Sequence, residues 1–337
     1  MHIEENKSLK EYNTFHIDCK ARYFVSISTI EELKEVLANK KFENRFLLGG
    51  GSNMLLTGDI DALVIHLNLK GITILSEDQQ KVNIEVMAGE NWHQFVMFCI
   101  SNNYGGVENL SLIPGNVGTA PIQNIGAYGV ELKDTFVKCN ALEIDTQRAR
   151  VFTKTDCNFG YRNSVFKNDL KGKYIITSVV FELTKTNHKK STSYGAIQDK
   201  LAEKNIFDPT IKDISDAVIY IRESKLPDPA KLGNSGSFFK NPVIDSETFR
   251  EFRVKFPEAP FYEVSASQFK IPAGWLIEQA GFKGKQIGDA GVHKNQALVL
   301  VNYGDASGQE IWELAILIQK KIKEMFGIYI EPEVNVI

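Results

Sequence analysis

The sequence lacks the features that mark membrane proteins, disulfide-rich proteins and nucleic-acid-binding proteins. No apolar run approaches the roughly 20 residues that a helix needs to cross a bilayer. The four cysteines, at positions 19, 99, 139 and 157, are widely spaced and form no C-x-x-C pair, so we expect reduced and mostly structural thiols. The net charge of -3, from 39 basic and 42 acidic residues, gives no reason to expect a polyanionic partner.

Two further signals are missing. The first seven residues, MHIEENK, carry acidic residues where a secretion signal has basic and then apolar ones, so we expect a soluble, cytoplasmic protein. None of the six histidines falls in an H-E-x-x-H pattern or a ligand cluster, so we expect no metal site. What is present is ordinary for a packed protein: 337 residues with 43% hydrophobic and 24% charged side chains predict two or three domains.

The hydrophobic periodicity predicts mixed α and β structure. The segment STIE at 28–31 predicts a capping box that opens a helix with Ile30, Leu33 and Leu37 on one face. The sequence LPDP at 226–229 predicts a hinge, because proline cannot continue a helix. The strands predicted are 23–27, 45–48, 62–67, 82–87, 136–144, 175–183 and 297–301, and the other helices are 91–102, 214–224, 246–255, 272–280 and 307–326.

Two glycine-rich segments, LGGGSN at 48–53 and IPGNVGTAPIQNIGAYG at 113–129, are candidates for anion binding. Glycine permits close backbone approach, so successive N–H groups of such segments converge on an anion. A Rossmann fingerprint is ruled out because Met54 stands where its third glycine belongs, and neither Gly-Lys pair fits a P-loop. A single cluster is most often a tight turn, but a loop as long as 104–129 inside a compact domain is typical of a functional segment.

Three motifs carry a resemblance to a known family: PIQNIGAYG at 121–129, GYRNSVFK at 160–167 and GSFFKNP at 236–242. With them the sequence resembles the UDP-N-acetylenolpyruvoylglucosamine reductases (UDP-N-acetylmuramate dehydrogenases) from YNTF at 12–15 to EPEV at 331–334. The resemblance implies an α+β fold with a vanillyl-alcohol-oxidase/PCMH-type FAD-binding domain. That domain would comprise two α+β subdomains in 1–226, rejoined by 328–337, and a smaller α+β substrate-binding domain would span 227–327.

The resemblance also implies the cofactors. FAD would be held without a covalent bond, and NADPH would be the co-substrate. The chain departs from the family at Ala120, where a second small hydroxyl residue is common, and this weakens one contact. The residues that would bind FAD are Gly49, Gly50, Gly51, Ser52, Asn53, Pro114, Gly115, Gly118, Thr119, Gln123, Asn124, Gly126, Ala127 and Tyr128.

The implied reaction is reduction of the enolpyruvyl double bond of UDP-N-acetylglucosamine enolpyruvate to UDP-N-acetylmuramate, a step of peptidoglycan precursor synthesis. By resemblance, Ser237 is the acid that protonates C2, and Arg162 grips the substrate carboxylate with two parallel donors. Glu333 is the third catalytic position. A carboxylate would repel the substrate's own, so the hypothesis is that Glu333 acts protonated, as a donor.

Four residues would bind the UDP-sugar by the same resemblance: Tyr194, Lys225, Asn241 and Gln296. The polar stretch 184–193 before Tyr194 is typical of a surface loop and resembles the subclass that closes a tyrosine-bearing loop on the diphosphate. Without the resemblance, a surface role for each of these four is nearly as good an interpretation. A serine in a glycine turn and an arginine in a surface salt bridge are the ordinary interpretations of Ser237 and Arg162.

Two other functions stay open at this point. One is an alcohol oxidase on the same fold, which would pass electrons to oxygen; the other is a non-catalytic sensor of flavin or nucleotide sugar. All three catalytic positions carry the residue types that catalysis needs, which favours the reductase over the sensor. The sequence leaves open the oligomeric state, where a monomer is plausible, and the preference for NADPH over NADH.

Overall fold

The computed structural model describes residues 2–337, and the chain divides into two compact units. Unit 1 comprises residues 1–5, 22–50 and 61–222, and unit 2 comprises residues 6–21, 51–60 and 223–337. Each unit is therefore assembled from three stretches of sequence. The predicted domain boundary at residues 226 and 227, with 328–337 returning to the first domain, stays a prediction.

A four-stranded sheet in unit 1 carries the first helix. The strands lie in the order β1 (Glu4–Ser8), β2 (Lys20–Ile27), β5 (Ile60–Leu67), β3 (Arg45–Leu48), and helix α1 (Ile30–Ala38) buries Leu33, Val36 and Leu37 against β2 and β5. The predicted capping box was wrong by one residue: Thr29 is the N-cap, and its hydroxyl accepts from Glu32 N at 3.1 Å. Ile30, the first helical residue, is only partly buried.

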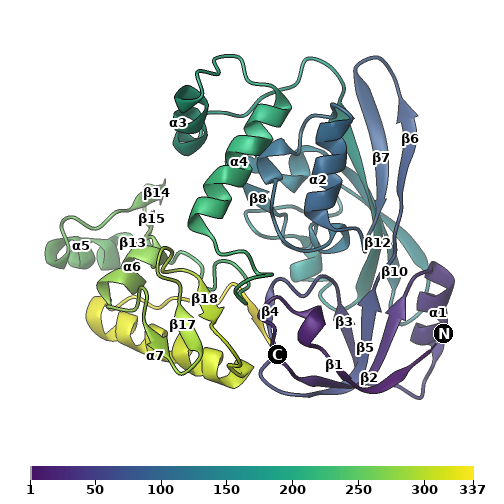
Figure 1. Ribbon diagram of the computed structural model, residues 1–337, viewed down its shortest axis with the longest axis horizontal. Helices are drawn as coiled ribbons and strands as arrows, with labels where there is room; N and C mark the ends of the chain where they lie inside the picture. Colours follow the sequence, from purple (N-terminus) through teal and green to yellow (C-terminus); the bar gives the residue numbers. More distant parts are fainter. Residues whose placement is uncertain (1) are drawn as a thin grey trace. The chain divides into compact units, whose positions relative to one another are not determined.

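A five-stranded antiparallel sheet forms the larger core of unit 1. Its order is β11 (Ala149–Thr153), β10 (Phe136–Glu143), β12 (Tyr174–Thr184), β7 (Lys81–Met87), β6 (Ile72–Glu77). Helix α2 (Trp92–Ser101) lies against it (Figure 1), with the Trp92 and Phe95 rings 5.9 and 4.8 Å from that of Phe181. The Trp92 indole donates to Leu110 O at 2.9 Å, which fixes the residues just before the glycine-rich segment to α2.

The remaining elements of unit 1 surround the glycine-rich segment. Short strands β8 (Gly126–Ala127) and β9 (Val130–Glu131) form a hairpin within it. Helices α3 (Gly195–Glu203) and α4 (Ile211–Lys225) share a small core against which Tyr128 packs. Helix α3 and strands β1, β6 and β11 had no counterpart in the sequence prediction.

Unit 2 combines small sheets with three helices. The sheets are β13 (Val243–Asp245), β15 (Gln268–Lys270), β14 (Tyr262–Ser265); β16 (Gln286–Ile287), β17 (Ala290–Val292), β18 (Leu300–Asn302); and β4 (Met54–Leu55), β19 (Asn335–Val336). The helices are α5 (Ser246–Lys255), α6 (Ala273–Gln279) and α7 (Gly308–Phe326), of which α7 lies beside β17 and β18 (Figure 1). Aromatic rings pack the three helices together. The ring centroid of Phe326 in α7 lies 5.8 Å from that of Trp275 in α6 and 4.8 Å from that of Phe256 at the end of α5.

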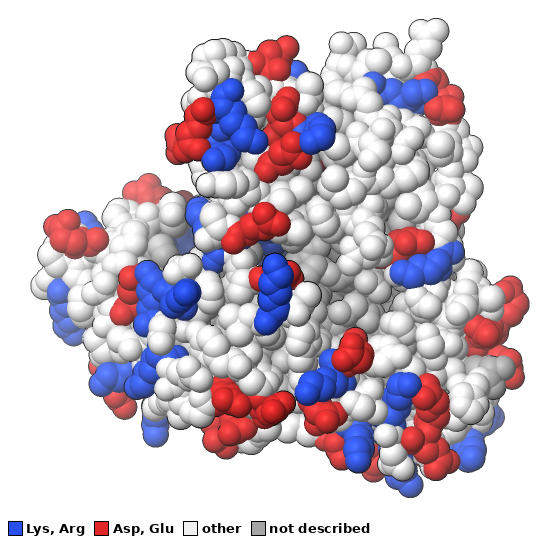
Figure 2. Space-filling model, viewed as in Figure 1, with Lys and Arg blue, Asp and Glu red and all other residues white. Residues whose placement is uncertain are grey.

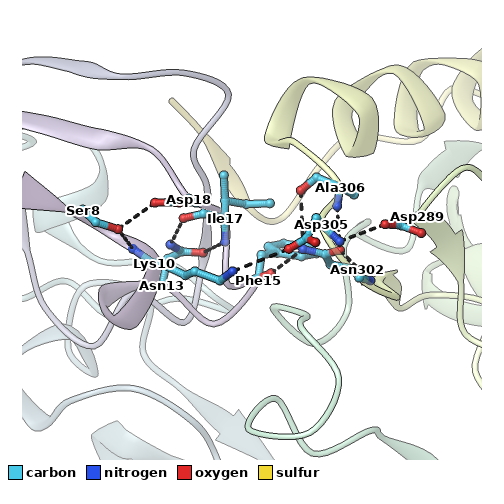
Figure 3. Close-up of polar contacts among 11 residues, drawn as sticks. Ser8, Lys10, Asn13, Phe15, Ile17, Asp18, Asp289, Asn302, Asp305 and Ala306 are labelled. Carbon is cyan, nitrogen blue, oxygen red and sulfur yellow. Dashed lines mark hydrogen bonds and ion pairs between the residues drawn. The ribbon is translucent and has the colours of Figure 1, made fainter.

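One buried asparagine ties the early segment of unit 2 to its late strands (Figure 3). The side chain of Asn302 donates to Phe15 O at 3.0 Å and accepts from Ala306 N at 3.0 Å, while its backbone N–H donates to Gly233 O at 2.8 Å. Residues far apart in the sequence are thereby held at one point. The loop that leads into Ser237 starts from this point.

The surface and the thiols agree with the composition. On the face drawn in Figure 2, basic and acidic side chains are interspersed, and neither sign gathers into a large patch. Within residues 2–337 no helix is long and apolar enough to span a bilayer, and no group of three or more potential metal ligands was found. All four cysteines are free and buried, as expected of structural thiols.

Candidate active site

The two glycine-rich segments approach each other closely in unit 1. A Cβ added to Gly50 would lie 2.8 Å from Asn116 Oδ1 and 3.1 Å from Gly115 Cα, and one added to Gly49 would lie 2.9 Å from Thr119 Cγ2. Any larger residue would therefore push the segments apart. Among the described residues, the backbone N–H groups of Gly49 and Gly50 have no hydrogen-bond acceptor. A pair of glycine loops with unused amides fits the pyrophosphate of a dinucleotide such as FAD.

The segments 121–129 and 160–167, two of the three motifs, are hydrogen-bonded to each other in unit 1. Asn124 Nδ2 donates to Gly160 O at 3.0 Å, and Ser164 Oγ donates to Ile122 O at 2.6 Å. The Arg162 guanidinium donates to Gly126 O, and Arg162 itself has a φ of 54°. These bonds hold an unfavourable backbone conformation at Arg162 and aim its guanidinium at the glycine-rich segment.

Both the NH₂ group and the oxygen of the Asn124 side chain form hydrogen bonds within unit 1. Its second amide hydrogen bonds Glu131 Oε2 at 3.2 Å, and its oxygen accepts from Lys133 N at 3.1 Å. The side chain is fully buried. With both hydrogens used inside the protein, the Asn124 amide positions the loop, a role that the sequence did not predict.

Two tyrosines meet at the end of the glycine-rich segment. The Tyr128 and Tyr194 rings lie edge to face with centroids 5.2 Å apart. The buried Asn109 amide donates to Tyr128 O at 3.1 Å and to Ser191 O at 2.8 Å, so it joins the segment that precedes Tyr194 to the glycine-rich loop. Tyr194 is the N-cap of α3 and is 52% exposed, which leaves its ring accessible.

In unit 2, Ser237 precedes a buried residue that is hydrogen-bonded on both sides. Phe238 N donates to Leu298 O at 2.8 Å, and Phe238 O accepts from Glu333 N at 2.8 Å. After Glu333 the chain enters β19, which pairs with β4, and Asn335 N donates to Asn53 O at 3.2 Å. Ser237, Glu333 and Asn53 are at least 96 positions apart in the sequence, and they lie on hydrogen-bonded segments of the same unit.

The turn before Ser237 is built by one asparagine. Asn234 is buried; its amide donates to Leu232 O at 2.8 Å and its oxygen accepts from Gly236 N at 2.9 Å. Gly236 has a φ of 69°, in the region that favours glycine. Ser237 is partly buried, and its hydroxyl has no hydrogen-bond partner among the described residues, so it is available to a ligand.

Two predicted substrate residues present their amide donors in the same way. Asn241 Oδ1 accepts from Ala273 N at 2.9 Å, and Gln296 Oε1 accepts from Leu298 N at 3.4 Å. With each oxygen held by a backbone N–H, each NH₂ group is left to donate to an acceptor outside the protein. Lys225, the last residue of α4, is exposed and forms no ion pair with a described residue.

The residues predicted to bind FAD, bind substrate or act in catalysis divide between the two units. Gly49, Gly50, Arg162, Tyr194 and the segment 114–128, which includes Pro114, Gly115, Gly118, Thr119, Gln123, Gly126 and Ala127, belong to unit 1. Gly51, Ser52, Asn53, Lys225, Ser237, Asn241, Gln296 and Glu333 belong to unit 2. Sequence reasoning missed Asn109 and Asn234, whose roles come from contacts with distant segments.

Comparisons with known proteins match both parts of the chain. Residues 21–152 match the family model described as an FAD binding domain, and residues 228–337 match that of the UDP-N-acetylenolpyruvoylglucosamine reductase C-terminal domain. The UDP-N-acetylenolpyruvoylglucosamine reductase of Flavobacterium johnsoniae is 63% identical over 337 residues, with 100% of both chains covered. That of Pseudomonas putida is 48% identical over 334 residues, with 98% of each chain covered.

A solved structure shares the fold. The crystal structure of the reductase from Thermus caldophilus matches with a TM-score of 0.67 and 23% identity, covering 100% of this chain and 99% of that one. The fold class is therefore as predicted, an FAD-binding domain of the PCMH type with a second α+β domain. With two relatives above 45% identity over nearly their whole length, the chain belongs to the UDP-N-acetylenolpyruvoylglucosamine reductase family.

Proposed function

We propose that the protein reduces the enolpyruvyl double bond of UDP-N-acetylglucosamine enolpyruvate, with FAD as bound cofactor and NADPH as reductant, in peptidoglycan precursor synthesis. Membership of the reductase family and the unpartnered hydroxyl of Ser237 beside the Glu333 segment carry this proposal. When bound, FAD passes the electrons of NADPH to the substrate as a hydride. The enzyme is thus an oxidoreductase that acts on a CH–CH group. The alcohol oxidase of the same fold is not favoured, since the family matched is a reductase.

The catalytic roles follow from where charge develops. Hydride addition at C3 puts negative charge on C2 and, by conjugation, on the carboxylate. Arg162 would bind the carboxylate, and its attraction would grow as that charge develops. Ser237 would donate its hydroxyl proton to C2, a contribution of about 10²–10⁴-fold to the rate. Glu333 would act as a hydrogen-bond donor in protonated form.

The diphosphate would be bound by donors. The NH₂ groups of Asn241 and Gln296 are left available by their bonded oxygens, and they suit phosphate oxygens, as does the exposed ammonium of Lys225. Tyr194 would close on the same group, as in the tyrosine-loop subclass. The glycine-rich segments 49–53 and 114–128 would hold the FAD. A cytoplasmic location and a monomeric state remain predictions.

The test is spectroscopic first and kinetic second. The purified protein should be yellow, and NADPH added without oxygen should bleach the flavin absorbance. UDP-N-acetylglucosamine enolpyruvate should then restore the absorbance, with one NADPH consumed for each product formed. A flavin that reoxidises only with oxygen, and not with the enol ether, would overturn the proposal in favour of an oxidase.

A further inference from the structure

Arg222 is a second arginine of unit 1 that contacts the glycine-rich region, and no role has yet been assigned to it. It lies in the last turn of α4 and is partly buried, with Nε 3.2 Å from Leu112 O. Neither Arg162 nor Arg222 forms an ion pair with a carboxylate in the described chain. A partly buried pair of like charges without a counterion is costly unless a ligand supplies the negative charge.

The contacts of Arg222 place it on the glycine-rich segment. Leu112, which accepts its Nε–H, immediately precedes the predicted FAD loop, and Tyr128 packs on the small core that contains Ile221, the residue before Arg222. Burial lowers the pKa of Arg222; Tyr128 opposes this, while the charge of Arg162 adds to it. The two guanidiniums are therefore mounted at opposite ends of one loop, on Leu112 and on Gly126.

An internal structural role accounts for only part of this arrangement. A guanidinium has five donors, and the carbonyl of Leu112 and the hydroxyl of Tyr128 both leave its charge uncompensated. Arg45 provides the contrast in the same unit. Its guanidinium donates to Phe42 O and Asn39 O at 3.0 Å each and holds the end of α1, where no second arginine is involved.

We propose that Arg222 is a second charge-stabilising residue of the reaction, and that with Arg162 it forms a site for a planar, delocalised anion. This rests on the proposed function, which supplies two such anions: the substrate carboxylate as C2 gains charge, and the reduced isoalloxazine ring. Both are flat groups with two neighbouring acceptors, which suits the fork of a guanidinium.

The test compares Arg222→Met, Arg222→Lys and the control Arg45→Met, each as the FAD-loaded full chain. Two quantities are measured besides turnover: the midpoint potential of the bound flavin, and the dissociation constant of the enolpyruvyl substrate from the oxidised enzyme. UDP-N-acetylglucosamine, which lacks the carboxylate, serves as the reference ligand.

If the anion is the reduced flavin, Arg222→Met should lower the equilibrium ratio of reduced to oxidised flavin about tenfold. The midpoint potential of the flavin would then fall by about 30 mV, the value for a two-electron couple. If the anion is the carboxylate, the substrate should bind about tenfold more weakly while UDP-N-acetylglucosamine binds as before. Arg222→Lys should recover part of either effect, and Arg45→Met should change only thermal stability.

The inference fails if Arg222→Met folds, retains FAD and leaves both the potential and the substrate affinity as in the wild type. It also fails if Arg222→Met weakens the binding of the enolpyruvyl substrate and of UDP-N-acetylglucosamine equally, because the effect would then be structural. Either result is separate from a failure of the proposed function, which would already appear as a wild-type protein whose reduced flavin ignores the enol ether.

Discussion

The two units hold their functional groups in opposite ways. In unit 1, three residues of the site have left-handed backbone, with φ of 45° at Asn124, 49° at Tyr128 and 54° at Arg162, and side-chain hydrogen bonds to main-chain carbonyls keep them there. In unit 2, Ser237 leads into an extended segment bonded on both edges, and its hydroxyl makes no bond to the protein. One site is built on strained loops and the other on ordinary strand-like pairing.

This difference indicates how substitutions should affect each group of residues. Non-glycine residues in the left-handed region cost about 1–3 kcal/mol each and persist only where the surroundings fix them. Changes around Arg162 should therefore act through geometry, even when the changed residue touches no ligand. Changes at Ser237 should act on chemistry alone, because nothing in the fold depends on its hydroxyl.

The largest effect should come from Ser237→Ala. Loss of the proton donor should lower kcat about 10²–10⁴-fold. Reduction of the flavin by NADPH and thermal stability should stay as in the wild type, because the hydroxyl has no protein partner. Stopped-flow measurement of the two half-reactions, together with thermal unfolding, checks this.

Ser235→Ala is the matched comparison two residues earlier. Its buried hydroxyl lies 3.2 Å from Met54 O and 3.2 Å from Thr14 Oγ1, so its loss should lower the free energy of unfolding by about 1 kcal/mol. If Ser237→Ala destabilises the fold as much as Ser235→Ala, the view of Ser237 as a purely chemical group is wrong.

Local signals predicted the regular elements well. The strand at 45–48 and the helix at 246–255 have the predicted ends. The helix predicted at 307–326 starts one residue later, at Gly308, with Ser307 as its N-cap. The strand predicted at 297–301 is shorter, at Leu300–Asn302, because Val299 N bonds Gln296 O and turns the chain first. Helix α3 was missed because its sequence, GAIQDKLAE, opens with glycine and has only two large apolar residues, Ile197 and Leu201.

The site was predictable only where a motif identified it. Resemblance supplied Arg162, Ser237 and Glu333, but no residue pattern indicates that Arg222 differs from a surface arginine on an amphipathic helix. Its environment depends on Leu112, 110 positions away, and on Tyr128. Asn234 and Asn109 are similar cases, since their value lies in the carbonyls that the fold brings to them.

A smaller effect, in unit 1, should come from Gly126→Ala. The added Cβ would lie 2.7 Å from Arg162 Nη1 and 3.0 Å from Val130 O, so the guanidinium must shift. A displacement of this kind should lower kcat about tenfold, since misplaced groups lose transition-state stabilisation steeply. Gly58→Ala, where the Cβ meets nothing within 4 Å, is the control. Equal activity of the two variants would show that the position of Arg162 is not as tightly set as the geometry of unit 1 indicates.

The smallest expected effect is on the pH dependence of stability, and it involves one histidine in each unit. Burial is the main cause that lowers the pKa of His66 in unit 1 and of His293 in unit 2, below the ordinary 6.5. A lowered pKa keeps both histidines mainly neutral in the folded state at and above pH 6.5. Above pH 6.5 they are neutral in the unfolded state as well, so they leave stability unchanged; as the pH falls below 6.5 the unfolded chain binds protons that the folded chain does not, and stability declines.

The surroundings of the two histidines predict that substituting each one changes the acid sensitivity of its own unit. His66 is stacked on Phe24, and its Nδ1 lies 3.0 Å from Ser26 Oγ, whereas His293 Nδ1 is buried without a hydrogen-bond partner in the described chain. His66→Gln should reduce the acid sensitivity of β5, and His293→Gln that of β17, when amide hydrogen exchange is followed between pH 7 and pH 5. If each substitution changes both strands equally, the units open as one body under acid, and the contrast between them is confined to how their sites are built.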